Sequence, residues 1–226
     1  QNTTMGWSVM SYVATFPKLR SSWDDDGYDY WDPLFYSMPG INDIRAVQWL
    51  YGMAPEKNPG NDTYSWSGPV HVTIYDTGGT DTIDVSNYSL DCTIDLTPGT
   101  ISYLGTDELY AQIPNGNGTN DYDYGHIGFP IGIAEGTIIE NATTGSGDDT
   151  ITCNTAINTI TCGSGNDDVL LISTGDIVFG GHGYDNFYIN SLDFNHIDGG
   201  VGTDVTDGEG DGLYFHGIYS GSVIDL

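Results

Sequence analysis

Aspartates and glycines recur together at a fixed spacing in the second half of the chain, and both residue types suit a calcium site. Written in nines from Thr144, the sequence reads TGSGDDTIT, CNTAINTIT, CGSGNDDVL, LISTGDIVF and GGHGYDNFY, then a degenerate INSLDFNHID and GGVGTDVTD. Glycine lets a turn adopt positive φ, and aspartate supplies the oxygen ligands that calcium prefers. The pattern predicts a parallel β-helix that holds calcium in its turns.

Glycine-rich turns occupy every second nonapeptide, so they stack along one edge if each coil takes two nonapeptides. We expect up to three calcium ions along this edge, one between successive turns, with backbone carbonyls completing each shell at about 2.3–2.6 Å. The predicted ligand aspartates are Asp149, Asp167, Asp185 and Asp204. The predicted turn glycines are Gly145, Gly147, Gly163, Gly165, Gly181, Gly183, Gly200 and Gly202.

The opposite edge carries much weaker metal signals. Its turns CNTA, LIST and INSL lack glycine and offer only Asn158, Asp176 and Phe194 at the matching position, so we expect few or no ions there. The alternative for the whole repeat region is a plain β-solenoid without metal. Calcium is favoured because stacked carboxylates repel one another unless a cation lies between them.

One apolar residue per nonapeptide stays in phase and is expected to point inward. These residues are Ile151, Ile160, Val169, Val178 and Phe187. The fold class predicted from this pattern is mainly β, a right-handed parallel β-roll. Cys153 and Cys162 fall on opposite edges, so we expect them, like Cys92, to be free buried thiols rather than a disulfide.

A further calcium turn is predicted upstream, in the segment DTGGTDTID. Its carboxylates are Asp76, Asp81 and Asp84, around Gly78 and Gly79. The alternative is a β-hairpin with a type I′ or II′ turn. The surrounding residues 68–104 alternate apolar and polar positions and predict β-strands.

One helix is expected, from about Asn42 to Tyr51. Asn42 or Asp43 would cap it, and Gly52 would end it. Its shared apolar face consists of Ile44, Val47 and Leu50. Two stretches lack periodicity and are expected to be exposed loops, residues 114–128 and residues 21–34.

Charge and hydropathy exclude several partners. Thirty-two acidic residues against four basic ones give a formal net charge of -28, which argues against nucleic acid or an anionic membrane surface. A hydrophobic content of 38% argues against disorder. No apolar run reaches the roughly 18 residues of a membrane span, and no signal peptide is visible. Because it starts at Gln1, we interpret the chain as a processed or partial piece of a longer product.

Four segments in order resemble the serralysin-type secreted zinc metalloproteases, metzincins of peptidase family M10 with a C-terminal RTX β-roll. They are WSVMSY from Trp7, NDIRAVQWLYG from Asn42, TIYDTGGTDTIDVSNYS from Thr73 and IAEGTIIENATTGSGDDTI from Ile133. The resemblance implies that residues 1–65 are the C-terminal end of a protease domain, containing the Met-turn and closing helix. It implies that residues 66–226 are the calcium-binding roll.

By this resemblance Met10 would lie under a catalytic zinc and Tyr12 would ligate or hydrogen-bond at that zinc. The H-E-x-x-H-x-x-G-x-x-H helix that supplies the zinc ligands and general base is absent from the sequence. The five histidines lack zinc-ligand spacing and are interpreted as ordinary surface or turn residues. Zinc is therefore expected only in a full-length parent, and this chain alone is expected not to hydrolyse peptides.

Two functions follow as hypotheses. In the first, the chain belongs to a secreted zinc endopeptidase and calcium drives its folding after secretion. In the second, it is a non-catalytic structural or adhesive extracellular protein, such as a surface-layer or appendage subunit. The second is favoured by the missing helix and by five Asn-x-Ser/Thr sequons, at Asn2, Asn61, Asn87, Asn117 and Asn141. Expected partners are calcium ions and a protein substrate or extracellular assembly partners, without nucleic acid and without membrane insertion.

Overall fold

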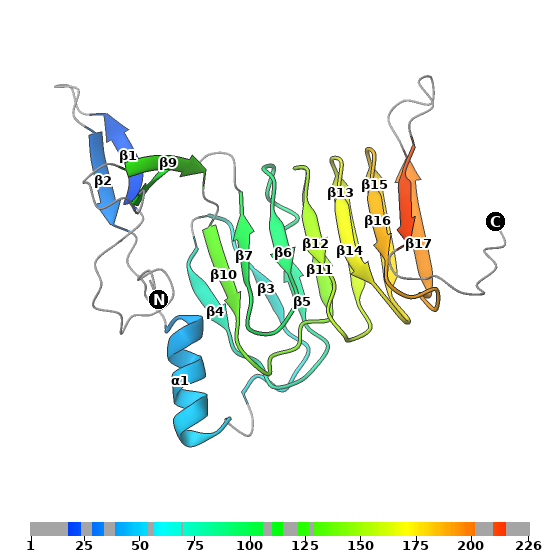
Figure 1. Cartoon of the computed structure of the whole chain (residues 1–226), viewed down its shortest axis with the longest axis horizontal. Coiled ribbons are helices and arrows are strands. Elements are labelled where there is room, and N and C mark those ends of the chain that lie inside the picture. The colour runs from blue at the N-terminus through cyan, green and yellow to red at the C-terminus, as the bar shows by residue number, and fades with distance from the viewer. Residues whose placement is uncertain are drawn as a thin grey trace.

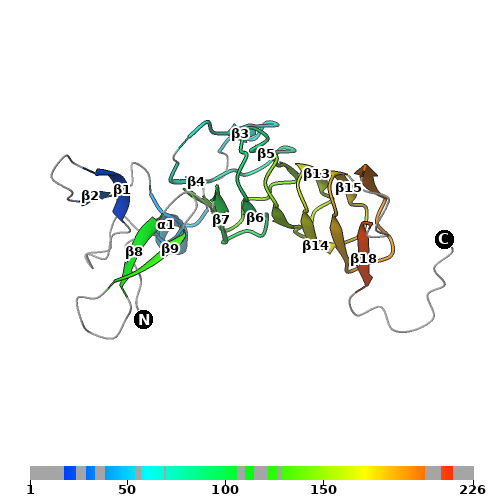
Figure 2. The ribbon, with the colours of Figure 1, turned by 90° about the horizontal axis from the view of Figure 1, so that it is seen from above.

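The computed structural model describes residues 18–23, 29–33, 39–53, 57–68, 70–105, 110–114, 122–126, 129–201 and 210–215. Two sheets face each other and the chain alternates between them, which makes a roll (Figures 1 and 2). The fold is therefore mainly β with parallel sheets, as the repeat pattern predicted.

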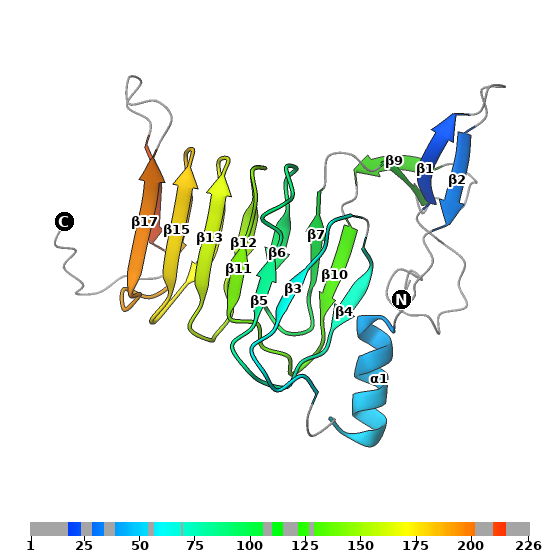
Figure 3. The ribbon, with the colours of Figure 1, turned by 180° about the vertical axis from the view of Figure 1, so that it is seen from behind.

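The first sheet has six strands, all paired in parallel, and Figure 3 shows it from the front. In spatial order they are β17 (His196–Val201), β15 (Ile177–His182), β13 (Thr159–Ser164), β11 (Asn141–Thr143), β5 (Thr82–Asp84) and β3 (Thr63–Ser65).

The second sheet has eight strands and is parallel except at β7, which runs antiparallel to both of its neighbours. Its strands in spatial order are β18 (Gly212–Phe215), β16 (Asn186–Ile189), β14 (Asp168–Ile172), β12 (Thr150–Thr152), β6 (Thr93–Asp95), β7 (Ile101–Leu104), β10 (Phe129–Ile133) and β4 (Val72–Ile74).

The pairing register shows that one coil takes two nonapeptides. Thr159 lies between Asn141 and Ile177, each a full coil away. The five residues predicted to point inward are at most 1% exposed and belong to one continuous hydrophobic core, which confirms the phase of the repeat. Each coil therefore contributes at least one buried apolar side chain from each sheet. The turns between the strands form the two long edges of the roll.

The strands predicted in residues 68–104 are present as β4, β5, β6 and β7. The hairpin alternative for DTGGTDTID is wrong, because β4 and β5 lie in different sheets. Strand β3 pairs with β5, so residues 63–65 belong to the roll's sheet although they precede the predicted boundary at residue 66. The division into 1–65 and 66–226 stays a prediction.

Helix α1 (Ile41–Tyr51) matches the predicted helix but begins differently. Its N-cap is Gly40 rather than Asn42 or Asp43, and Asp43 instead accepts a hydrogen bond from the Gly40 backbone N–H at 2.9 Å. Gly52 ends the helix with φ of 83°, as predicted. The predicted apolar face is not covered, since Val47 is 53% exposed and Leu50 is 62% exposed. In the described residues no helix is long and apolar enough to cross a bilayer.

Both predicted loops contain strands. A four-stranded antiparallel sheet has the order β2 (Asp29–Pro33), β1 (Lys18–Trp23), β8 (Tyr110–Pro114) and β9 (Tyr122–His126). The loop predictions for residues 21–34 and 114–128 are therefore wrong where these strands lie. Local pattern failed here because the sheet also needs pairing between segments more than 90 residues apart, such as Leu19 and Ala111.

Candidate metal sites

The turns that lead into the eight-stranded sheet place a column of polar residues along one edge of the roll. We call it the glycine edge, because the predicted glycine turns lie there. One column residue immediately precedes each of the strands β6, β12, β14, β16 and β18, which pair with one another in register. In order, its members are Cys92, Asp149, Asp167, Asp185 and Asp211.

One oxygen of each aspartate is fixed by the backbone of the preceding coil. The N–H of Cys92 donates to Asp149 Oδ1 at 2.7 Å, and the N–H of Asp149 donates to Asp167 Oδ1 at 2.7 Å. The N–H of Asp167 donates to Asp185 Oδ1 at 3.0 Å, and that of Asp185 to Asp211 Oδ1 at 3.1 Å. These bonds hold successive carboxylates in a line, one per coil.

The other oxygen of these aspartates is buried and has no hydrogen-bond partner. This holds for Oδ2 of Asp149, Asp167 and Asp185. A buried carboxylate oxygen without a donor is costly, and the remedy in proteins is a proton, a donor or a cation. An oxygen without a donor recurs in three successive coils, which makes this row a candidate for cation binding, since calcium can bind such oxygens directly.

Backbone carbonyls lie beside these carboxylates because the glycine turns stack very closely. A Cβ placed on Gly163 would overlap the carbonyl of Gly145, and one on Gly181 would overlap the carbonyl of Gly163. Both residues also have positive φ, 102° and 110°, which disfavours any side chain. A Cβ on Gly180 would overlap Asp185 Oδ2, so the glycine turn forms the pocket that receives the carboxylate.

The electrostatics of the column disfavour ionised carboxylates in the absence of a cation. Burial, and then the neighbouring carboxylates of Asp149 and Asp185, raise the pKa of Asp167 to about 7. Burial also raises the pKa of Asp149, and burial together with Asp211 raises that of Asp185. At neutral pH a divalent cation would relieve this repulsion and let all three ionise.

The fourth position of the column departs from the sequence expectation. Asp204 and Gly202 lie outside the described residues, and the structure places Asp211 next to Asp185. The interval from Asp185 to Asp211 is 26 residues, whereas the two intervals just before it are 18. Sequence reasoning kept a nine-residue count and so missed Asp211. The signal was the pattern DGLYF, an aspartate directly before an apolar strand.

The second edge consists of the turns that lead into the six-stranded sheet. The side chains of Asn158 and Asp176 on this edge are satisfied by hydrogen bonds. The N–H of Asn158 donates to Asp176 Oδ1 at 2.8 Å, and the N–H of Ser173 donates to Asp176 Oδ2 at 2.7 Å. The amide of Asn158 donates to the carbonyl of Glu140 at 3.0 Å. The position predicted for Phe194 belongs to Asn195, because the extra residue shifts the register.

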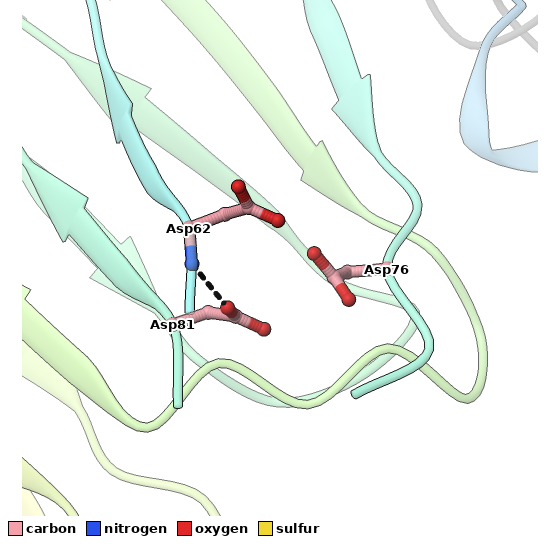
Figure 4. A group of neighbouring side chains, drawn as sticks. All are labelled: Asp62, Asp76 and Asp81. Atoms are coloured by element: carbon pink, nitrogen blue, oxygen red, sulfur yellow. Dashed lines mark hydrogen bonds between the residues drawn. The ribbon is translucent and has the colours of Figure 1, made fainter. Parts of the chain in front are cut away.

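A compact acidic group lies at the N-terminal start of the second edge. Figure 4 shows Asp62, Asp76 and Asp81 with their carboxylates facing a common space. One oxygen of each lies within 4.8 Å of the other two. Asp81 Oδ1 accepts the N–H of Asp62 at 2.8 Å, whereas Asp81 Oδ2 is buried without a partner. Burial raises the pKa of Asp81.

The turn around this group has the same construction as the glycine edge. A Cβ on Gly79 would overlap the carbonyl of Gly60, which brings a backbone oxygen close to the acidic group. The structure thus brings Asp76 and Asp81 together as predicted but adds Asp62 in place of Asp84. Asp84 lies at the end of β5 and accepts the N–H of Ser86 at 3.1 Å. Asp62 was missed because only the parallel pairing of β3 with β5 brings it there.

No zinc site is visible among the residues that the structure describes. The single cluster of three or more potential ligands there is the group of Asp62, Asp76 and Asp81, and it contains no histidine. Met10 and Tyr12 lie outside the described residues. All three cysteines are free and buried, as predicted, and burial raises the pKa of Cys92 to about 12.

Comparison with known proteins finds metalloproteases. Serralysin G of Dickeya chrysanthemi is 32% identical over 169 residues, which are 69% of this chain and 29% of that protein. Metallopeptidase AprA of Pseudomonas marginalis is 28% identical over 69% of this chain and 30% of its own length. Serralysin of Proteus mirabilis is 27% identical over 62% of this chain and 28% of its own length.

No protein-family model matches the chain. The chain spans less than a third of the length of these relatives. The similarity nevertheless covers about two thirds of this chain and recurs across several organisms. The chain is therefore a sequence relative of the serralysin-type metalloproteases, which confirms the relationship that its motifs predicted.

Proposed function

We propose that this chain is the calcium-binding RTX β-roll portion of a secreted, serralysin-like zinc metalloendopeptidase, and that calcium drives its folding after secretion. The observation that carries the proposal is the row of three buried, unpartnered aspartate oxygens along the glycine edge. The relationship to serralysins and metallopeptidases supports the protease parent. The zinc chemistry would belong to that parent, with Met10 and Tyr12 contributing to its zinc site.

Calcium suits the glycine edge better than smaller or softer cations do. The available ligands are oxygens only, from the carboxylates and from turn carbonyls such as that of Gly163. Calcium accepts six to eight oxygens at irregular angles, whereas magnesium demands a near-ideal octahedron. Zinc prefers nitrogen and sulfur ligands, and the thiol of Cys92 remains protonated because burial raises its pKa to about 12.

Calcium would control folding by binding only the folded chain. The ligand oxygens come from successive coils, so the sites form only when the coils stack. At a calcium concentration 100 times Kd, each site adds about 2.7 kcal/mol to the free energy of unfolding. Three such sites are comparable to the whole stability of a typical domain. The net charge of -28 opposes compaction when calcium is scarce.

The test is a calcium titration of the whole chain, followed by circular dichroism and by calorimetric stoichiometry. We expect a calcium-dependent gain of β-structure, reversed by a chelator. Asp167→Asn keeps an acceptor for the N–H of Asp149 but removes the charge, so it should weaken calcium binding at least tenfold. Asp176→Asn is the matched control, because it removes a buried carboxylate from the second edge, and it should leave calcium binding unchanged.

Two results would contradict the proposal. One is a circular dichroism spectrum and melting temperature that a chelator leaves untouched. The other is an equal loss of calcium affinity in Asp167→Asn and Asp176→Asn, because binding would then follow overall charge rather than the glycine edge. The protease parent is tested separately, by assaying peptide hydrolysis in the product of the complete gene with and without zinc.

A further inference from the structure

Helix α1 contacts the roll along one of its faces, at the end of the roll where β10 and β4 lie (Figures 1 and 3). The contact residues Ile41, Arg45 and Gln48 are spaced by four and three residues and therefore share a face. Ile41 is 6% exposed and lies over Gly132, where a Cβ would touch it. Arg45 forms an ion pair with Glu135, and Gln48 Nε2 donates to the Glu135 carbonyl at 2.9 Å.

These contacts matter because the helix is short. A helix of 11 residues is marginal in water by itself, and most of its stability in a protein comes from packing. Four large side chains on the rest of its surface are more than half exposed, namely Val47, Trp49, Leu50 and Tyr51. The helical conformation therefore depends on the face that touches the roll, and hydrogen exchange of its backbone amides reports whether that face is in place.

The segment that holds the helix, residues 135–140, also holds the turn of the acidic group. Thr137 Oγ1 accepts the N–H of Asp76 and donates to the carbonyl of Asp76, both at 3.0 Å. Thr137 is fully buried, so water does not compete for these bonds. Glu140 Oε2 accepts the N–H of Asp81 at 2.7 Å. One short segment thus connects the helix to two of the three aspartates that Figure 4 shows.

Residues 57–62, which follow the helix in sequence, form a second connection. The N–H of Thr77 donates to the Lys57 carbonyl at 3.0 Å, and the N–H of Lys57 donates to Thr77 Oγ1 at 2.8 Å. The N–H of Asp62 donates to Asp81 Oδ1 at 2.8 Å. The acidic group therefore lies where the residues after the helix meet the turn that residues 135–140 hold.

Bringing these segments together costs electrostatic free energy when no cation is bound. Asp62, Asp76 and Asp81 direct their carboxylates to a common space, and the Glu140 carboxylate lies beside Asp81. Asp81 is fully buried, and its Oδ2 has no partner. Burial raises the pKa of Asp81, and the charges of Asp76, Glu140 and Asp62 raise it further. Repulsion among four carboxylates opposes the contacts that support the helix, and a divalent cation would reverse that effect.

We propose that a calcium ion in the acidic group fixes helix α1 to the roll. The ion binds where the three segments meet, so it stabilises the arrangement in which residues 135–140 lie under the helix. Without the ion the segments separate and the helix loses its support. The proposal rests on the proposed function in taking calcium as the cation, but it uses carboxylates outside the glycine edge. In the protease parent, this site would couple calcium binding by the roll to the placement of the helix that closes the protease domain.

Hydrogen exchange at saturating calcium tests the proposal in the whole chain, with the β13 amides as the reference within the roll. Asp81→Asn keeps an acceptor for the N–H of Asp62 but removes the charge, so it weakens calcium binding at the acidic group. We expect the amides of α1 to exchange at least tenfold faster and those of β13 to stay unchanged. Asp84→Asn is the matched control, because it neutralises a nearby carboxylate outside the acidic group, and it should change neither.

Thr137→Val tests the connection rather than the ion. It removes both hydrogen bonds to Asp76 and leaves every carboxylate in place. The α1 amides should again exchange at least tenfold faster, whereas a calorimetric titration should find as many bound calcium ions as in the unmodified chain. Asp81→Asn should bind one ion fewer. Unchanged exchange of α1 in either variant would overturn the proposal. So would equal acceleration in α1 and β13, because the acidic group would then support the whole roll rather than the helix.

Asp167→Asn on the glycine edge separates this proposal from the proposed function. If Asp167→Asn weakens calcium binding but Asp81→Asn leaves α1 unchanged, the proposal for the helix fails and the proposed function stands. If Asp81→Asn releases α1 but Asp167→Asn binds calcium normally, the proposal for the helix stands and the glycine edge is not the calcium site.

Discussion

The two edges of the roll differ in how they provide hydrogen-bond partners for their stacked polar side chains. Both place a polar side chain before each strand, and both use one carboxylate or amide oxygen to accept the backbone N–H of the preceding coil. On the glycine edge the second oxygen, as in Asp167, is left buried without a partner. On the second edge the second oxygen of Asp176 accepts the N–H of Ser173.

The contrast explains why cation binding is proposed for the glycine edge and not for the turns of Asn158 and Asp176 on the second edge. A turn with side chains can fold back and donate its own N–H to the carboxylate, as the turn at Ser173 does. A turn of glycines packs flat on the turn below and presents carbonyl oxygens instead, as Gly163 and Gly181 do. The glycine turn thus places carbonyl oxygens, which are acceptors, around the carboxylate. A cation or a proton is then needed to interact favourably with these oxygens.

The largest expected effect breaks the glycine stack itself. Gly181→Ala places a Cβ against the carbonyl of Gly163 at φ of 110°, and we expect it to lower the free energy of unfolding by more than about 3 kcal/mol. Gly175→Ala is the matched change on the second edge, where φ is 87° but the Cβ meets only the Ile157 side chain. It should lower stability by about 1 kcal/mol.

Urea denaturation at saturating calcium measures both variants. Similar losses in the two would show that strained φ alone, and not the stacking of glycine turns, sets the difference between the edges. Gly181→Ala should also weaken calcium binding, whereas Gly175→Ala should not.

A second prediction asks whether charge alone can create a site on the second edge. Asn158→Asp removes the amide that donates to the Glu140 carbonyl and to Asn154 Oδ1, and it buries a carboxylate. We expect a loss of about 2–3 kcal/mol in the free energy of unfolding. Calcium should not restore it, because the turn at Asn158 lacks the glycine carbonyls. Recovery in a calcium titration would show that glycine turns are dispensable for binding.

A third prediction concerns the pH dependence of the metal-free chain. Asp167 has a pKa of about 7 in the folded state, above its ordinary value of 3.8. Such a group takes up a proton on folding, so its stabilising contribution is full below about pH 4 and is lost as the pH rises through about 7. The metal-free roll should therefore gain on the order of 2 kcal/mol between pH 7 and pH 5.

The calcium-loaded roll should show the opposite trend over the same range. Protons and calcium compete for the same oxygens, so acidification weakens the binding that stabilises the folded chain. Circular dichroism in chelator, as the pH falls from 7 to 5, measures the first trend as a gain of β-structure without calcium. Thermal melts in calcium at the two pH values measure the second. If the calcium-loaded protein also gained stability on acidification, calcium would not be bound by the aspartate oxygens of the glycine edge.

The smallest expected effect lies on the second edge. Ser173→Ala removes the hydroxyl that lies 3.3 Å from Asp176 Oδ2 but keeps the backbone N–H that donates at 2.7 Å. We expect a loss of about 0.5 kcal/mol and no change in calcium affinity. A clear fall in calcium affinity in a binding titration would mean that the two edges are coupled across the core.

Much of the roll could be predicted because its information is local and repeated. The phase of Ile151, Val169 and Phe187 was correct, since an apolar residue recurs at the same place in each of the five clean nonapeptides. Predictions failed where an insertion broke the count, as at Asp211, or where distant segments pair, as β1 and β8 do. The acidic group of Asp62, Asp76 and Asp81 shows the second cause, because Asp62 reaches the turn of Asp76 and Asp81 only through the pairing of β3 with β5.

The repeat, the side of the chain that faces the core and the edge on which glycine turns stack can all be read from the amino-acid order. Periodicity is enough for these, because each coil repeats the conformation of the one before. Three properties became visible only in the folded chain: which oxygens lack a donor, that Asp62 rather than Asp84 joins the acidic group, and that Leu213 is exposed to solvent. Those properties depend on which atoms neighbouring coils bring together, and atoms from different coils meet only after the chain has folded.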